Sequence, residues 1–199
     1  TNCDNYRKCA DYHQKNDGLK RELFIAGSST QLAPVRDAAS FPNFKVQNVF
    51  VNGTIWTGSG ESTRELFPDK STFTGAGAAK EASPSENSCS AVIKVSYGKF
   101  DYYGGGDAGF NGASNFAWKD VEGNVSKVVG QVDVMKAPPH GSTDGCSQTL
   151  LTTLAPSDII VNVWQAVQPR AVTYERMISS STNGGKSRIA AYVAARSLW

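Results

Sequence analysis

The stretch SAVIKVSYGKFDYYGGGD, residues 90–107, decides the fold of this chain. Residues 90–98 predict a buried strand, and Gly98-Lys99 forms the turn to a second strand, so that the pair is a β-hairpin. The second strand ends in three glycines and Asp107. Glycines let the backbone turn sharply, and ligand sites of α/β proteins usually lie at strand ends. Asp107 is therefore a candidate site residue, or an aspartate that caps the next turn.

The rest of the chain is β-rich in its first half and alternates helix and strand in its second. Further strands are predicted at residues 23–27, 44–51, 54–58, 131–137, 158–164 and 188–194, with a tight turn at Asn52-Gly53. Helices are predicted in part of 1–23, over 120–130 and 147–156, and from near Pro169. Residues 58–87, rich in Gly, Ser, Pro and Ala, predict a long exposed loop. This order predicts an α/β or α+β fold.

Composition places few limits on function. A chain of 199 residues can form a single domain or most of a larger one. The net charge of +2 does not by itself indicate nucleic-acid binding. The sequence contains no run of 18 apolar residues, so it does not predict a membrane span. The polar N-terminus is not a signal peptide and resembles a processed end, so the compartment stays open, with the exterior favoured. The chain has four cysteines, Cys3, Cys9, Cys89 and Cys146. They are either free thiols or paired in one of three ways, of which one includes a local Cys3–Cys9 disulfide. No CxxC motif occurs, so a cysteine-rich metal site is not expected.

One histidine follows a predicted strand in VDVMKAPPHGSTDG, residues 132–145. A lone loop histidine such as His140 is usually solvated or a packing residue. Together with Asp107, however, it would offer an imidazole and a carboxylate, which suit zinc, manganese or iron, although catalytic sites generally need three or more ligands. The only other histidine, His13, lies in a polar helical run and is expected at the surface. Aromatic residues near Asp107 could stack on a substrate or fill the core: Tyr102, Tyr103, Phe110, Phe116 and Trp118.

Two segments taken together resemble metallo-β-lactamase-fold hydrolases of the ComEC type. Residues 85–107 resemble the family's hydrophobic hairpin that ends in Gly-Asp, and residues 132–151 resemble its strand followed by a His-His-Gly-Ser motif. Glu122 resembles a glutamate near the start of the intervening helix, and 157–180 resemble the next strand and closing helix. The resemblance is good over about residues 86–180 and weaker over 20–60.

This resemblance implies an αββα sandwich with one or two divalent metals, zinc or manganese, at its edge. Asp107 would match the aspartate that bridges the metals, and His140 the second histidine of the motif. A metal-bound hydroxide would then attack a phosphoester, in the nuclease version a nucleic acid. Lys136 could face this site, but capping of its strand is the favoured expectation.

The chain departs from the family pattern at two points. Pro139 stands where the motif has its first histidine, and the opening HxHxDH motif, which supplies most ligands, is absent. The chain could thus be the C-terminal part of a longer domain, a degenerate binding module without metal, or one half of a site completed by a second chain. A lactone or ester hydrolase of the same superfamily is a further alternative. A half-sandwich would expose an apolar sheet face, so we expect the N-terminal half or a second chain to cover it.

Overall fold

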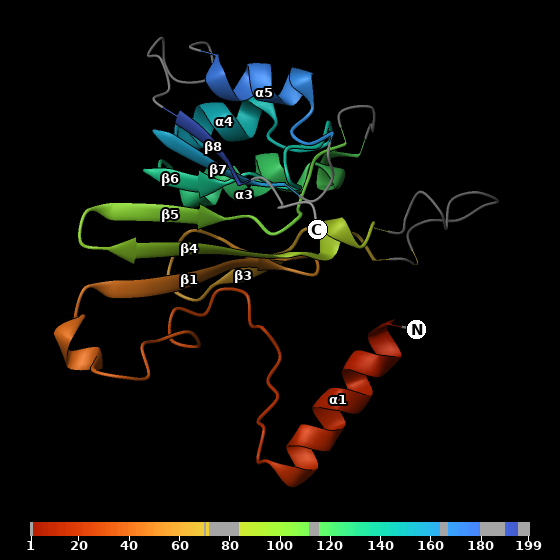
Figure 1. Ribbon diagram of the computed structural model, residues 1–199, viewed down its shortest axis with the longest axis vertical. Coiled ribbons are helices and arrows are strands. Elements are labelled where there is room, and N and C mark those ends of the chain that lie inside the picture. The colour runs from red at the N-terminus through yellow and green to blue at the C-terminus, as the bar shows by residue number, and fades with distance from the viewer. Residues whose placement is uncertain are drawn as a thin grey trace.

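The described residues form a mixed sheet of eight strands, ordered β3-β2-β1-β4-β5-β6-β7-β8 (Figure 1). The computed structural model describes residues 2–69, 71, 84–111, 116–163, 167–179 and 190–194, with the backbone only at 2, 3 and 190–194. The predicted mixture of helices and strands is confirmed. The strands are β1 Phe44–Val51, β2 Thr54–Trp56, β3 Thr63–Glu65, β4 Ala91–Tyr97, β5 Phe100–Gly104, β6 Val134–Lys136, β7 Asp158–Asn162 and β8 Ala190–Ala194.

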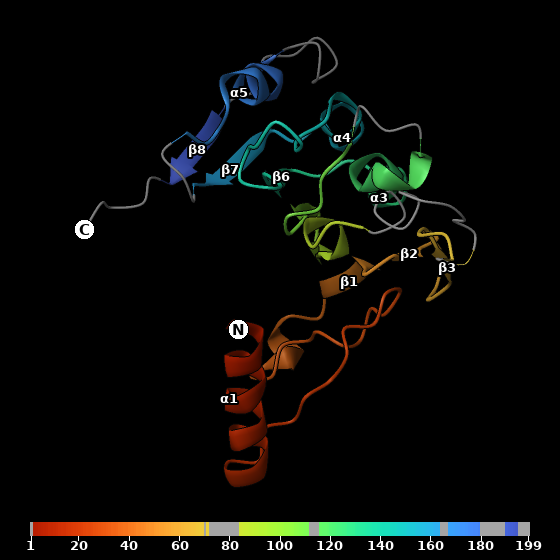
Figure 2. The ribbon, with the colours of Figure 1, turned by 90° about the vertical axis from the view of Figure 1, so that its right-hand side faces the viewer.

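The sheet changes character at β5. From β3 to β5 neighbouring strands are antiparallel, and from β5 to β8 they are parallel. Each parallel step contains a helix: α3 (Val121–Val129), α4 (Gln148–Leu154) or α5 (Ala171–Ile178). Such crossovers are almost always right-handed. Because the three steps run in one direction across the sheet, the three helices lie on the same face (Figure 2).

Local signals in the sequence explain where α3 and α4 begin. The Asp120 side chain accepts a hydrogen bond of 2.8 Å from Gly123 N, and the Ser147 hydroxyl accepts one of 3.1 Å from Leu150 N. Both bonds satisfy a backbone N–H that has no partner inside the first helical turn. Gly130, with a φ of 71°, ends α3. Both predicted helices are confirmed.

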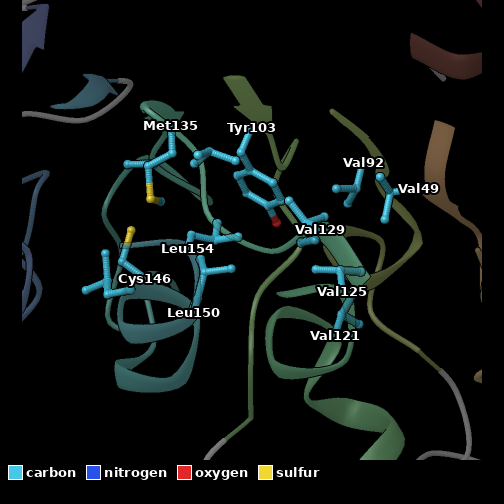
Figure 3. Packing of buried hydrophobic residues seen from close by; sticks show 14 of the residues in the cluster. Val49, Val92, Tyr103, Val121, Val125, Val129, Met135, Cys146, Leu150 and Leu154 are labelled. Atoms are coloured by element: carbon cyan, nitrogen blue, oxygen red, sulfur yellow. The ribbon is translucent and has the colours of Figure 1, made fainter. Parts of the chain in front are cut away.

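The hydrophobic core lies between these helices and the sheet. In Figure 3 the valines of α3, together with Leu150 and Leu154 of α4, pack against Tyr103 and Met135 of the sheet. Burying one such side chain contributes about 1.5–3 kcal/mol. The buried members of the cluster are Val49, Phe50, Ile55, Val92, Tyr103, Ala108, Val121, Val125, Val129, Val132, Met135, Ala137, Cys146, Leu150, Leu151, Leu154, Ile159, Val161 and Met177. We call this side of the sheet the closed face.

The opposite side of the sheet is only partly covered by the described residues. Tyr97, Phe100 and Ile160 point there and are 48%, 45% and 39% exposed. Strand β4 was predicted to be buried, and this is wrong for one of its faces, because the described helices of the crossovers all lie on the other. We call this side the open face, and its exposed or half-buried apolar side chains are Ile93, Val95, Tyr97, Phe100, Tyr102, Val134 and Ile160.

The N-terminal region consists of a helix that leaves the sheet and a segment that contacts it, since Gly27 N donates to Asn48 O of β1 at 2.8 Å. The predicted polar helix is confirmed as α1 (Asn2–Asn16), which projects away from the strands (Figure 1). The strand predicted at 23–27 is wrong, since Leu23 and Ile25 are 86% and 57% exposed and lie in irregular backbone. Ile25 N donates to Gln31 Oε1 at 2.9 Å and Gln31 Nε2 donates to Leu23 O at 2.6 Å, so a side chain occupies groups that a strand would pair. None of the described helices has the length and apolarity needed to cross a bilayer.

The predicted loop at 58–87 contains a strand. β3 pairs with β2 along three residues of each strand, and all three residues of β3 are exposed. So short and polar a strand has no hydrophobic alternation by which the sequence could reveal it. Residues 70 and 72–83 of this segment lie outside the described residues.

The structure does not form the local Cys3–Cys9 disulfide, because the Cys9 thiol is exposed and free. The Cys3 side chain itself lies outside the described residues. Cys146 is buried in the core and its Sγ donates to Pro138 O at 3.4 Å. Cys146 therefore takes part in packing beside the segment that carries His140.

Candidate active site

Three segments meet at the carboxyl ends of β5, β6 and β7. Residues 105–107 follow β5, residues 137–140 follow β6, and Asn162 ends β7. Neighbouring parallel strands all end at the same edge of a sheet, where α/β proteins commonly place their sites. The structure brings Asp107 and His140, 33 positions apart in the printed sequence, together at this edge.

The contacts converge on one oxygen atom. His140 Nε2 lies 3.4 Å and Lys136 Nζ 3.1 Å from Asp107 Oδ1. The Lys136 ammonium also donates to the carbonyl oxygen of Gly106. The other ring nitrogen, His140 Nδ1, lies 2.6 Å from Asn162 O. Asp107 thus faces an imidazole and an ammonium together.

The position of Lys136 corrects the expectation that it caps its strand. Its side chain faces Asp107 and is only 16% exposed. Strand register explains the orientation, because Lys136 pairs with Gly104 in β5 and Ile160 in β7 and so lies on the open face. Gly104 has no side chain between Lys136 and the turn that carries Asp107. The alternation of side chains along β6 indicates the face on which Lys136 lies. The sequence does not show whether its ammonium contacts Asp107 or caps the strand.

The hydrogen bonds of His140 determine which nitrogen carries the proton. A carbonyl oxygen only accepts, so Nδ1–H donates to Asn162 O. In the neutral ring, Nε2 is then an acceptor that faces a carboxylate oxygen, which also only accepts. A cation between or beside two such acceptors, here 3.4 Å apart, stabilises their approach. That cation can be a second proton on the ring, the Lys136 ammonium or a metal ion.

The separation of the two acceptors also fits a metal ion. Zinc–ligand bonds of about 2.0–2.1 Å in a tetrahedral arrangement place two ligand atoms about 3.3–3.4 Å apart. His140 Nε2 and Asp107 Oδ1 are separated by 3.4 Å. Within the described ranges, no group of three or more His, Cys, Asp or Glu side chains could complete the coordination. The two residues therefore fit part of a metal site, and the Lys136 ammonium competes for the same oxygen.

The loop after β6 aims the imidazole. His140 and Gly141 have φ values of 58° and 72°, in the left-handed region. For His140 this conformation costs on the order of 1–3 kcal/mol and persists only where the surroundings hold it. At Gly141 a side chain would not fit, because its Cβ would lie 2.6 Å from Pro169 Cβ. Pro139 is buried beside Gly145, where a Cβ would lie 2.2 Å from its Cδ.

Glu122 of α3 lies behind this loop. Its Oε1 accepts from Cys146 N at 2.8 Å and its Oε2 accepts from Ser147 N at 2.7 Å. The side chain is fully buried, and burial raises the pKa of Glu122 to about 8, against the hydrogen bonds from Ser147 and Cys146, which lower it. Burial, and then the charge of Glu122, raise the pKa of Tyr103 well above its ordinary value. The Tyr103 hydroxyl has no hydrogen-bond partner in the described part of the chain.

A cavity of about 550 Å³ lies along two of the loops that carry the site. Phe110 and Trp118 are its aromatic lining, whereas Tyr103 is part of the core. Its volume suits a small organic ligand. The cavity is formed by Pro84, Ser85, Asn87, Ser88, Gly109, Phe110, Asn111, Trp118, Lys119, Thr143 and Asp144.

The second histidine lies elsewhere. His13 is on α1, is exposed, and contacts Asp17 Oδ2 through Nδ1 at 2.5 Å.

No protein-family model matches the sequence, and no curated protein is significantly similar to it.

Proposed function

We propose that this chain supplies part of the active site of a metal-dependent hydrolase that cleaves phosphoesters, on a ComEC-type metallo-β-lactamase fold. The observation that carries the proposal is the pair of acceptors, His140 Nε2 and Asp107 Oδ1, held 3.4 Å apart at the edge of the sheet. The resemblance of residues 85–107 and 132–151 to that family supports it. A nucleic acid is one phosphoester substrate within this class.

Each residue of the cluster has a distinct role in the proposal. A bound divalent ion, zinc or else manganese, would supply a water of lowered pKa and polarise the phosphoryl oxygen. Asp107 and His140 hold the ion, and the carbonyl of Asn162 orients the imidazole by accepting its Nδ1–H. Lys136, 3.1 Å from Asp107, stabilises the negative charge that develops on the phosphoryl oxygens.

The remaining ligands would come from the partner that covers the open face. Metal sites of this kind need at least three protein ligands. The site lies at the rim of the open face, since Lys136 belongs to that face. We propose that the N-terminal half of the same domain, or a second chain, packs there as the other half of an αββα sandwich. The exposed side chains of Tyr97, Phe100 and Ile160 support this placement.

Metal analysis of the purified protein tests the proposal. Because the described residues supply only two ligands, we expect the chain alone to bind zinc weakly in equilibrium dialysis, and Asp107→Ala and His140→Ala to abolish this binding. His13→Ala is the matched control, because it removes a histidine from a distant exposed helix and should leave binding unchanged. Hydrolysis of bis-p-nitrophenyl phosphate with zinc or manganese, compared with a lactone, identifies the ester class. A stably folded chain that binds neither metal contradicts the proposal.

One observation favours a second candidate function, a metal-free binding module. The Lys136 ammonium already provides a cation for Asp107 Oδ1, and Pro139 replaces a histidine of the family motif. Lys136→Met separates the two functions. In the hydrolase, loss of the competing ammonium strengthens zinc binding, whereas in the binding module the variant still takes up no metal.

A further inference from the structure

We propose that Glu122 is a positioning residue for this site: it holds the loop 137–147 and thereby sets His140 opposite Asp107. The inference depends on the proposed function at one point, namely that His140 is a ligand of the metal ion. Glu122 accepts from Cys146 N and Ser147 N, at the far end of that loop from His140. It therefore acts through the backbone of the loop.

The loop transmits the position of Cys146 to His140. Cys146, like His140, has a left-handed backbone, with a φ of 54°. Its thiol donates to Pro138 O at 3.4 Å, two residues before His140. Gly145 lies so close that a Cβ there would be 2.0 Å from the same oxygen. A shift of Cys146 consequently moves the turn that begins at Pro138.

Helix α5 holds the same loop from the other side. Arg176 Nη1 donates to Cys146 O at 3.0 Å, and Nη2 donates to Thr143 O at 3.3 Å. The Thr173 hydroxyl donates to Ser142 O at 2.9 Å. Glu122 thus accepts from the N–H of Cys146 while Arg176 donates to its C=O. The loop is clamped between α3 and α5, and either contact can displace it.

The strength of this clamp depends on the charge of Glu122. An ionised carboxylate accepts shorter and stronger hydrogen bonds than a neutral carboxylic acid, so the loop is held more tightly once Glu122 loses its proton. The titratable groups around the carboxyl group are Tyr103 on β5, Cys146 in the loop and Asp120 at the start of α3. The charged Arg176 on α5 reaches the other side of the loop, at Cys146 O.

NMR of the whole chain, with and without zinc, tests the proposal. Glu122→Gln keeps the shape but turns one carboxylate oxygen into an amide donor that faces a backbone N–H. We expect the ring signals of His140 to shift and zinc affinity to fall about 10–100-fold, as for other residues that orient a metal ligand. Ser126→Ala is the matched control, because Ser126 is equally buried on α3 and bonds only the helix carbonyl of Gly123. This control should leave both readouts unchanged.

A pH titration of the unmodified protein provides a test that needs neither metal binding nor a folded variant. We expect the amide protons of Cys146 and Ser147 and the ring proton of His140 to share a titration midpoint near pH 8, the pKa of Glu122. Loss of this midpoint in Glu122→Gln, which leaves the Cys146 thiol in place, excludes the thiol as its source. Absence of the shared midpoint, or equal effects of Glu122→Gln and Ser126→Ala on His140, overturns the positioning role. Failure of zinc binding in the unmodified protein overturns the proposed function alone.

Discussion

Neighbouring residues of β5 and β6 point to opposite faces of the sheet and differ in their burial. Tyr103 and Met135 point to the closed face and are fully buried, whereas Tyr102 and Lys136 point to the open face and keep some exposure. Burial raises the pKa of Tyr102, and that of Tyr103 further still. The closed face therefore provides the stability of the fold, and the rim of the open face provides the candidate site.

The largest effect is expected on the closed face. Leu151→Ala removes a fully buried side chain of α4 and should lower the free energy of unfolding by about 2–5 kcal/mol. Thr152→Ala, at an exposed position of the same helix, should cost less than about 0.5 kcal/mol. Urea denaturation measures both. Similar losses for the two variants would mean that α4 does not pack on the closed face.

Glu122 gives the closed face a dependence on pH. Its folded-state pKa of about 8 lies above the ordinary 4.5, so the folded protein binds the proton more tightly than the unfolded chain does. The stabilisation is complete below about pH 4.5 and is lost as the pH rises to about 8, by up to about 1.4 kcal/mol for each pH unit. Glu122→Gln should remove this slope in denaturation series, while Glu65→Gln at an exposed position should preserve it. A stability that rises across this window would contradict the assignment.

Loss of the α4 cap should have a smaller effect. Ser147→Ala removes the acceptor of Leu150 N and should cost about 0.5–2 kcal/mol. Thr149→Ala, two residues along at an exposed position, serves as the control for replacement by alanine. Thermal unfolding followed by circular dichroism measures the difference, and equal midpoints for the two variants would rule out a contribution of the cap.

Elements with a local signal could be predicted from the sequence. The hairpin of β4 and β5 follows from alternation around Gly98, and α3 follows from its valine spacing between Asp120 and Gly130. The meeting of Asp107 and His140 depends on one general rule, that neighbouring parallel strands end at the same edge.

Features that depend on distant contacts could not be predicted in this way. The backbone partners of Glu122 lie 24 and 25 residues further along the chain, and nothing near Glu122 in the sequence indicates them. Residues 23–27 have the apolar composition of a strand, but their backbone groups bond instead to the side chain of Gln31 and to Gln47 and Asn48 of β1. The apolar composition of residues 90–98 predicts a buried strand, but composition does not show that the described crossover helices all lie on one side of the sheet.

The smallest effect on stability is expected on the open face. Phe100→Ser removes an aromatic ring that is already 45% exposed and should change the free energy of unfolding of this chain by less than about 0.5 kcal/mol. The control is Tyr103→Ser, three positions along the same strand but on the closed face, where a loss of several kcal/mol is expected. If a second half of the domain covers the open face, Phe100→Ser should weaken that association much more than it destabilises the chain alone. A loss above about 2 kcal/mol in the isolated chain would show that its own residues already cover Phe100, and the proposed partner would then have no apolar face to occupy.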